Sequence, residues 1–307
     1  MKKIFAALLI IVIVAIGFFF AFPEKIAGYF IDYERGKAGL VKKEIKIDDH
    51  KIVYLEGGRG TTILMLHGYS ANKDNWPRFA AFFTNNYHVV IPDLPGHGES
   101  SQLMNASYDA ASQIERLHKF RQAVKINKFH IVGNSMGGWF AGAYAVRYPD
   151  DVLSVGLFDA AGVQSLEKSE VVKLMEKGES PLLLKDSNDF DRLMKLVFVN
   201  PPRTPYPFKK MFIKQGLANR PFNEKIAKDM APGFTSLESD LPKIEAPALI
   251  LWGDQDKILD ISSVPVFEKG LKNYKTVIIK DCGHAPMLEK PKETSDAYLS
   301  FIRGIGK

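Results

Sequence analysis

The sequence predicts an α/β protein with a mainly parallel sheet that is covered by helices on both faces. Two observations predict this fold class. Short apolar runs end in turn residues along most of the chain, and segments of helical character separate these runs. Continuously apolar strands that alternate with helices are typical of parallel sheets buried on both faces. With 307 residues and 46% hydrophobic content, the chain is long enough for one large domain with a sizeable core.

The first segment, residues 1–22, predicts a membrane anchor. Lys2 and Lys3 precede a run over 4–22 that contains no charged or strongly polar side chain. As a helix, this run is about long enough to cross the core of a bilayer. A cleaved signal peptide is the competing interpretation, but such a peptide usually ends in small residues, and this run ends in "GFFFAFPEK". We therefore expect an uncleaved single-pass anchor, followed by a juxtamembrane connector over 23–41.

The charges that flank this run bear on its orientation in the membrane. The two N-terminal lysines favour a cytoplasmic N-terminus, which places the rest of the chain on the extracytoplasmic or periplasmic side. Five basic residues beyond the run favour the opposite orientation, namely Lys25, Arg35, Lys37, Lys42 and Lys43. The sequence favours the extracytoplasmic side and leaves the alternative open.

The net charge of +6 indicates an anionic partner. The lysines are spread along the chain and form no recognisable nucleic-acid motif, so we expect a bilayer surface as the partner and no nucleic acid. The single cysteine, Cys282, excludes an intramolecular disulfide but leaves the compartment open. The sequence indicates no obligatory protein partner.

Strand and helix signals then follow in order through a core that we assign to 42–161 and 238–307. "EIKID" and "KIVYLEG" predict a pair of strands joined by a turn. The next strand signals are "TILMLHG", "HVVIPD", "FHIVGNS" and "LSVGLFD", and the helical segments between them are "DNWPRFAAFFT", "SYDAASQIERLHKFRQAV" and "GGWFAGAYAVRY". Two later strand signals, "PALILWGD" and "KTVIIKD", are separated by a helix, "VPVFEKGL", and "KETSDAYLSFIRGI" predicts a closing helix.

The segment 162–237 interrupts this alternation. It contains no clear strand signal, is rich in lysine and has scattered leucine, methionine and phenylalanine. A segment of this length is too long for a bare connection inside a compact domain. It therefore predicts a helical cap inserted into the α/β core. The apolar residues of this cap either bind an acyl chain or pack the core of the cap itself.

A serine lies in a glycine-rich turn between a predicted strand and a predicted helix. The pattern is Gly133-Asn134-Ser135-Met136-Gly137, which is G-x-S-x-G in the context that gives this motif meaning. A nucleophile on so sharp a turn needs neighbours without side chains. The two glycines are therefore expected to leave the space in which the turn closes, and Ser135 is the predicted nucleophile.

A serine hydroxyl is a poor nucleophile unless a base removes its proton and an acid orients that base. In this motif the chain order is Ser, then acid, then His. His284, in "DCGHAP", is the only histidine after Ser135 and is the predicted base. Asp256, in "GDQDKILD", is the predicted acid, and Asp159, at the end of the strand before the cap, is the alternative. Asp254 is expected to support the turn that carries the acid.

The remaining histidines fall into two groups. His67 and His97 lie in glycine-containing loops and are candidates for shaping the pocket. The others lie within turn, strand or helix patterns, where we expect ordinary structural roles. They are His50, His88, His118 and His130.

The oxyanion of acyl transfer needs preorganised N–H donors. The backbone of Met136, which follows the nucleophile at the start of its helix, is expected to supply one donor. The loop after "TILMLHG" is expected to supply the second, from Tyr69. The alternative is that "LHGYSANKDNW" is only a loop that leads into a helix.

At these residues the sequence resembles the α/β-hydrolase superfamily. The resemblance rests on "HGYSANKDNW", "IPDLPGHGES", "GNSMGG", "LWGDQDK" and "CGHAPMLEKP", in family order, and extends from about Ile45 to the end apart from the cap. Within it, the sequence is most similar to membrane-anchored monoacylglycerol lipases and related bacterial lipases. That similarity implies a triad of Ser135, Asp256 and His284, oxyanion donors at Tyr69 and Met136, and no metal or organic cofactor.

The resemblance implies a serine ester hydrolase that acts on lipid esters, monoacylglycerols above all. Two alternatives remain. "GNSMGG" is also typical of hydrolases that cleave carbon–carbon bonds in ring-fission products, although those usually carry a tryptophan after the catalytic histidine, where this chain has Ala285. The second alternative is a non-catalytic α/β-hydrolase that serves as a scaffold. Such proteins usually lack a member of the triad, whereas this chain has all three.

Overall fold

The computed structural model describes residues 3–5, 8 and 17–305. Its centre is a sheet of eight strands in the order β1-β2-β4-β3-β5-β6-β7-β8. The strands are β1 (Leu40–Ile47), β2 (His50–Gly58), β3 (Thr62–Leu66), β4 (His88–Pro92), β5 (Phe129–Asn134), β6 (Val152–Phe158), β7 (Ala248–Gly253) and β8 (Tyr274–Ile279). β2 is antiparallel to both of its neighbours, and the strands from β4 to β8 are parallel. The predicted, mainly parallel α/β sheet is therefore confirmed.

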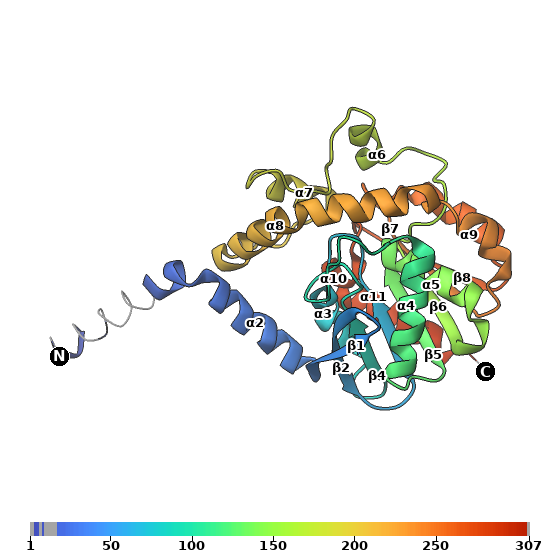
Figure 1. Ribbon diagram of the computed structural model, residues 1–307, viewed down its shortest axis with the longest axis horizontal. Coiled ribbons are helices and arrows are strands. Elements are labelled where there is room, and N and C mark those ends of the chain that lie inside the picture. Colours follow the sequence, from blue (N-terminus) through green and yellow to red (C-terminus); the bar gives the residue numbers. More distant parts are fainter. Residues whose placement is uncertain (1–2, 6–7, 9–16, 306–307) are drawn as a thin grey trace.

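Helices connect these strands and cover the sheet (Figure 1). They are α2 (Pro23–Lys37), α3 (Pro77–Ala80), α4 (Ala110–Ala123), α5 (Met136–Arg147), α6 (Glu170–Met175), α7 (Asp189–Val197), α8 (Tyr206–Met230), α9 (Val264–Gly270), α10 (Pro286–Glu289) and α11 (Pro291–Arg303). The helix expected at "DNWPRFAAFFT" is shorter than its pattern suggested. A 3₁₀ turn at Lys73–Asn75 precedes it, because Pro77 starts a new helix at its first position.

Most of the buried side chains form two layers, one on each face of the sheet. Successive residues of a strand point to opposite faces, so Leu64 packs in one layer and Ile63 in the other. The first layer includes residues of α4, α5 and α9, and the second includes residues of α3, α10 and α11. This burial on both faces explains why the strands read as continuous apolar runs.

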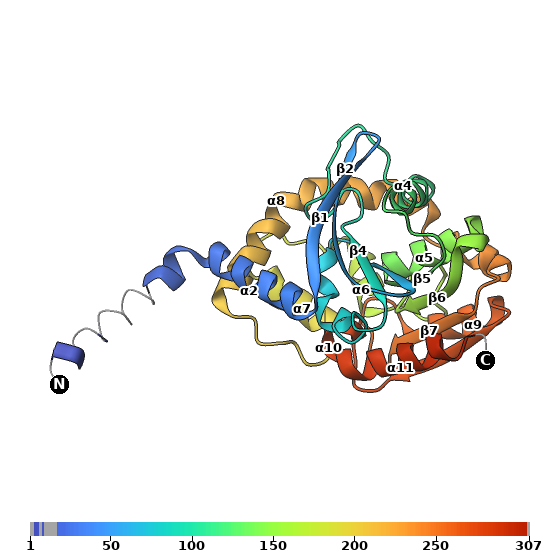
Figure 2. The ribbon, with the colours of Figure 1, turned by 90° about the horizontal axis from the view of Figure 1, so that it is seen from below.

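Residues 23–41, expected as a connector, contain the fifteen-residue helix α2. Both views show α2 leading away from the body of the molecule, with its N-terminal end beside the near end of α8 (Figures 1 and 2). Lys214 of α8 donates a hydrogen bond of 2.8 Å to Glu24, and Phe30 lies 6.1 Å from Phe208 between ring centroids. The expected connector is thus largely helical and contacts the cap segment.

The segment 162–237 between β6 and β7 holds α6, α7 and α8. Figure 1 shows the long helix α8 above the upper edge of the sheet, and its residues contact the loops after β3 and β4. Pro221 lies inside α8, where it interrupts the regular helix hydrogen bonds.

The predicted anchor over 1–22 lies largely outside the described residues, which omit 1–2, 6–7 and 9–16. Among the helices that the structure describes, none is both long enough and apolar enough to span a bilayer.

Candidate active site

Ser135 lies on the sharp turn between β5 and α5. Its backbone φ of 57° is in the left-handed region, which is strained for a residue with a side chain. A Cβ placed on Gly133 would lie 2.0 Å from the carbonyl oxygen of Gly137, and one on Gly137 would lie 2.3 Å from the carbonyl oxygen of Leu66. The turn therefore has no room for side chains at these two positions, which explains the glycines of the motif.

His284 and Asp256 are brought together from loops that follow β8 and β7. The two atoms His284 Nδ1 and Asp256 Oδ2 are 2.7 Å apart, and both side chains are buried. The other carboxylate oxygen of Asp256 accepts backbone N–H groups from Ile258 and Leu259, at 2.8 and 3.1 Å. Three donors thus converge on this carboxylate.

The side chain of Asn134, the residue before Ser135, joins the loop that carries His284 (the histidine loop) to the Ser135 turn. Its amide donates to the carbonyl oxygen of His284 at 2.8 Å and to that of Phe158 at 3.2 Å. In the described part of the chain, no hydrogen bond joins the Ser135 hydroxyl to His284. Catalytic hydrogen bonds in structures without substrate are often loose, and this bond is expected to form when substrate binds.

The other two aspartates have different partners. Asp159, the alternative acid, follows β6, is fully buried and accepts the Gly253 N–H at 2.9 Å. Asp254 accepts the Cys282 N–H at 3.3 Å, so it supports the histidine loop. The turn that carries the predicted acid is supported by Asp256 itself, which accepts the N–H of Ile258, two residues further on.

The loop after β3, which carries Tyr69, lies against Ser135. A Cβ placed on Gly68 would be 3.2 Å from the Cβ of Ser135. Met136 is the first residue of α5, so its N–H points out of the positive end of that helix. The Tyr69 loop and Met136 thus both lie next to Ser135.

The cap segment is hydrogen-bonded to this loop. The Tyr69 hydroxyl donates to the carbonyl oxygen of Asn223 in α8 at 2.7 Å, and the Asn223 amide donates to the Ser70 hydroxyl at 2.9 Å. At the other end of the site, the His284 N–H donates to the carbonyl oxygen of Val197 in α7 at 2.8 Å. The cap therefore contacts the loop after β3 that carries Tyr69, which we call the oxyanion loop after its proposed role. It also contacts the histidine loop.

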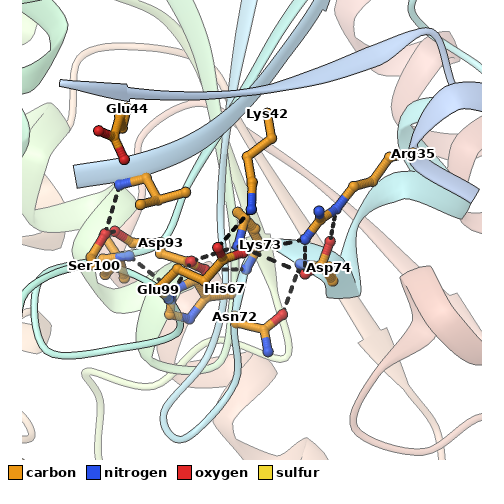
Figure 3. A network of polar contacts seen from close by, with 12 residues as sticks. Arg35, Lys42, Glu44, His67, Asn72, Lys73, Asp74, Asp93, Glu99 and Ser100 are labelled. Carbon is orange, nitrogen blue, oxygen red and sulfur yellow. Dashed lines mark hydrogen bonds and ion pairs between the residues drawn. The ribbon is translucent and has the colours of Figure 1, made fainter. Parts of the chain in front are cut away.

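An ionic network with the buried pair Lys73 and Asp93 at its centre adjoins the loop that carries Tyr69 (Figure 3). Lys73 donates to Asp93 from both its backbone N–H and its Nζ, each at 2.7 Å, and its Nζ also donates to Glu99 at 2.8 Å. Burial alone would lower the pKa of Lys73, but these carboxylates outweigh burial and raise it. Burial likewise opposes ionisation of Glu99, yet hydrogen bonds from Lys42 and Lys73 lower its pKa to about 2.

His67 and His97 lie together beneath the same loop, with ring centroids 5.2 Å apart. His67 Nδ1 lies 2.8 Å from the Gly68 carbonyl oxygen, and its Nε2 accepts the Leu94 N–H at 3.0 Å. These partners require a neutral ring that carries its proton on Nδ1. Burial lowers the pKa of His67 to about 4 and that of His97 to about 3. Both histidines therefore support the loop as neutral groups.

The four remaining histidines lie where the sequence predicted. They are His50 and His88 at the starts of β2 and β4, His118 in α4 and His130 in β5. Each has a partner in the body of the fold. His118, for example, stacks on Tyr148 with ring centroids 3.8 Å apart.

A comparison with known families agrees with this geometry. The family described as "alpha/beta hydrolase fold" matches residues 61–241 and 222–291, which is more than half of the chain. The chain belongs to the α/β-hydrolase fold family.

This α/β-hydrolase is 35% identical to Lipase 1 of Psychrobacter immobilis over 276 residues, which cover 88% of this chain and 87% of that protein. It is 30% identical to the monoacylglycerol lipase ABHD6 of Homo sapiens over 301 residues, or 94% and 89% of the two chains. The chain is also similar to a protein whose solved structure is described as a membrane phospholipase A. The two sequences are 43% identical, the match covers 99% of both chains, and the TM-score is 0.91. The resemblance to lipases inferred from the motifs, and the expected lipase/esterase-type enzyme, are confirmed.

Three residues that position the site of this α/β-hydrolase did not emerge from the motifs. Asn134 occupies a variable position of G-x-S-x-G, and Asn223 lies within the lysine-rich cap. Arg35, which joins the network of Figure 3, lies in the expected connector. Each acts through a partner far away in the sequence, so no local spacing identifies it.

Proposed function

We propose that this α/β-hydrolase cleaves lipid carboxylic esters through an acyl-enzyme formed on Ser135. The observation that carries the proposal is the 2.7 Å bond between His284 and Asp256, next to the strained turn of Ser135. Because the Asp256 carboxylate accepts from Nδ1, that nitrogen holds the proton, and Nε2 is left as the base.

The reaction follows from this arrangement. His284 Nε2 takes the Ser135 proton while the hydroxyl oxygen attacks the ester carbonyl. The N–H groups of Tyr69 and Met136 stabilise the resulting oxyanion. His284 then donates its proton to the leaving alcohol, and Asp256 stabilises the imidazolium throughout. A water activated by the same histidine hydrolyses the acyl-enzyme and releases the fatty acid.

Two lipid classes are the candidate substrates. Monoacylglycerols are the first, because the motifs and the similarity over 94% of the chain to a monoacylglycerol lipase both support them. Phospholipid acyl esters are the second, because a membrane phospholipase A is 43% identical over 99% of this chain. The same triad serves both classes, and the contacts with the head group decide between them.

Membrane association is part of the proposal. The apolar run over 4–22 supports an uncleaved single-pass anchor. The described helix α2 continues from that run and exposes Tyr29, Phe30 and Tyr33 to solvent. Exposed aromatic residues beside lysines are typical of segments at a membrane interface. Retention of the full chain in membranes after washing with alkaline carbonate would support the anchor, and complete release would contradict it.

Fatty-acid release tests the catalytic proposal. The intact protein in detergent micelles is given a long-chain monoacylglycerol, a diacyl phospholipid or a ring-fission dienoate. The same assays are made with Ser135→Ala and with the control variant Ser300→Ala, which changes an exposed serine on α11. We expect release from a lipid ester that disappears only in Ser135→Ala. Faster turnover of the dienoate would favour a carbon–carbon hydrolase. No turnover, together with no labelling of Ser135 by a fluorophosphonate probe, would indicate a scaffold.

A further inference from the structure

Asp159 and Asp256 form a buried pair of carboxyl groups beside His284. One carboxylate oxygen from each aspartate and one ring nitrogen of His284 all lie within 4.8 Å of one another. Asp159 is fully buried, and its backbone φ of 42° is in the left-handed region. Its N–H donates to Leu251, and its Oδ1 accepts from Gly253, so the residue is fixed across the ends of β6 and β7.

The two carboxyl groups differ in the donors that they receive. Asp256 accepts from His284, Ile258 and Leu259. Asp159 accepts only from Gly253, and among the described residues its buried Oδ2 has no donor. Two like charges so close together in a buried site do not both ionise. The charge therefore belongs on Asp256, which has three donors, and the proton belongs on Asp159.

We propose that Asp159 is a positioning residue of the triad: its protonated Oδ2 donates a hydrogen bond to the Asp256 carboxylate and holds that carboxylate toward His284. This inference rests on the proposed triad mechanism. It gives a role to a residue that the sequence offered only as an alternative acid. The bond leaves one negative charge, on Asp256, to stabilise the imidazolium.

The surroundings of Asp159 agree with a neutral acid. Burial and the charge of Asp256 raise its pKa well above the ordinary value, against the opposing effect of the Gly253 N–H, and Glu289 of α10 raises it further. Burial also raises the pKa of the nearby Cys282 thiol. The basic group of the cluster, His284, makes its hydrogen bond to Asp256.

A conservative pair of variants tests the proposal. Asn has the shape of a protonated Asp, with an N–H₂ that can donate to Asp256 and an oxygen that can accept from Gly253. Asp159→Leu keeps the branched shape of the side chain but removes both the donor and the acceptor of Gly253 N–H. With a soluble p-nitrophenyl ester, we expect Asp159→Leu to lower kcat by about tenfold or more and Asp159→Asn to restore it to within about threefold. In the plot of kcat/KM against pH, the acidic limb of Asp159→Asn should lie at the same pH as that of the unchanged protein, because the substitution removes no charge.

Several outcomes would overturn the inference. If Asp159 were ionised, Asp159→Asn would remove a negative charge beside His284 and move the acidic limb to lower pH. If Asp159 were itself the acid of the triad, Asp159→Asn would lose activity as severely as Asp256→Asn. If Asp159 only filled space, Asp159→Leu would keep its kcat.

A readout that needs no activity separates this inference from the proposed function. The infrared spectrum of the intact protein minus that of Asp159→Asn should show the carbonyl band of a buried carboxylic acid at neutral pH. A band of ionised carboxylate in its place contradicts the inference. Activity that persists in Ser135→Ala would contradict the proposed function instead, and it would leave the infrared result to decide the protonation of Asp159.

Discussion

The guanidinium of Arg35 in α2 donates two parallel hydrogen bonds to the carboxylate of Asp74, both of 2.7 Å, from Nε to Oδ1 and from Nη2 to Oδ2. Asp74 lies in the 3₁₀ turn that follows the oxyanion loop, next to Lys73. The helix beside the expected anchor is therefore joined to the network of Lys73, Asp93 and Glu99 that supports this loop (Figure 3).

Removing this contact is expected to destabilise the protein. Arg35→Met keeps much of the side-chain volume but leaves the partly buried Asp74 without its main partner, at a cost of about 1–3 kcal/mol. The midpoint of urea unfolding measures this loss. Lys119→Met is the control, since Lys119 pairs with the exposed Asp48 at 2.7 Å. We expect no measurable shift in the control. Equal effects of the two variants would show that the Arg35 contact is no stronger than a surface pair.

The close approach of Gly68 to Ser135 predicts an effect on catalysis. The Cβ of Gly68→Ala would lie 3.2 Å from the Cβ of Ser135, so the oxyanion loop must shift by a few tenths of an ångström. We expect kcat to fall by about 10-fold to 100-fold, because the Tyr69 N–H no longer meets the oxyanion correctly. Steady-state kinetics with a soluble ester measure this change.

Gly28→Ala provides the matched control for Gly68→Ala. Gly28 lies in α2 with no atom within 4 Å of the added Cβ. Alanine there should keep kcat unchanged and stabilise the protein by about 0.5–1 kcal/mol. A normal kcat in Gly68→Ala would mean that Gly68 is not held close to the nucleophile during turnover.

The sequence predicted those parts of the molecule that have a local signal. All eight strands and the Ser135 turn have a local signal in the sequence, because burial of the central strands on both faces and a sharp turn restrict residue types locally. Asp256 and His284 follow from chain order once the turn is recognised. The helical character of 23–37 was not predicted, because α2 buries few residues and lacks a clear apolar stripe.

Contacts between distant residues explain the remaining gaps. Arg35 and Asp74 are 39 positions apart, and Tyr69 and Asn223 are 154 apart. Neither pair leaves a periodic pattern in one sequence. The same limit applies to the partner of Asp159, since only the three-dimensional arrangement of β6 and β7 brings its carboxyl group to Asp256.

The buried neutral histidines predict how stability depends on pH. In the unfolded chain both rings take up a proton near pH 6.5, whereas burial lowers the folded-state pKa of His67 to about 4 and that of His97 to about 3. The unfolded state therefore binds more protons as the pH falls below 6.5, and the free energy of unfolding decreases. The slope is about 1.4 kcal/mol per pH unit for each histidine between about pH 6.5 and 4, and both contributions vanish above pH 7.

Urea unfolding at several pH values measures this dependence. We expect His97→Gln, which removes one of the two groups, to reduce the slope below pH 6.5 by the contribution of one histidine. At pH 7.5 the protonation of the histidines no longer contributes, so a difference in the free energy of unfolding between His97→Gln and the unchanged protein measures the loss of packing. A variant slope equal to that of the unchanged protein would show that His97 does not contribute to acid destabilisation.

The exposed aromatic residues of α2 predict an effect that depends on how the substrate is presented. Tyr29 and Tyr33 are 71% and 58% exposed, respectively, on the helix that adjoins the expected anchor and contacts the cap through Lys214. If these rings lie in the membrane interface, they set the tilt of α2 and hence the approach of the site to bilayer lipids. The double variant Tyr29→Ser/Tyr33→Ser should lower kcat/KM on monoacylglycerol in phospholipid vesicles by about tenfold. Hydrolysis of a soluble p-nitrophenyl ester should not change, because α2 contributes no residue to the triad.

Tyr274→Ser, at a 42% exposed position in β8, is the control for loss of a surface aromatic residue. It should leave both activities unchanged. A parallel loss of vesicle and soluble activity in the α2 double variant would mean that these tyrosines stabilise the fold instead. No loss in either assay would mean that α2 does not orient the site at the bilayer, and the apolar run before it would then be the remaining candidate for contact with the membrane.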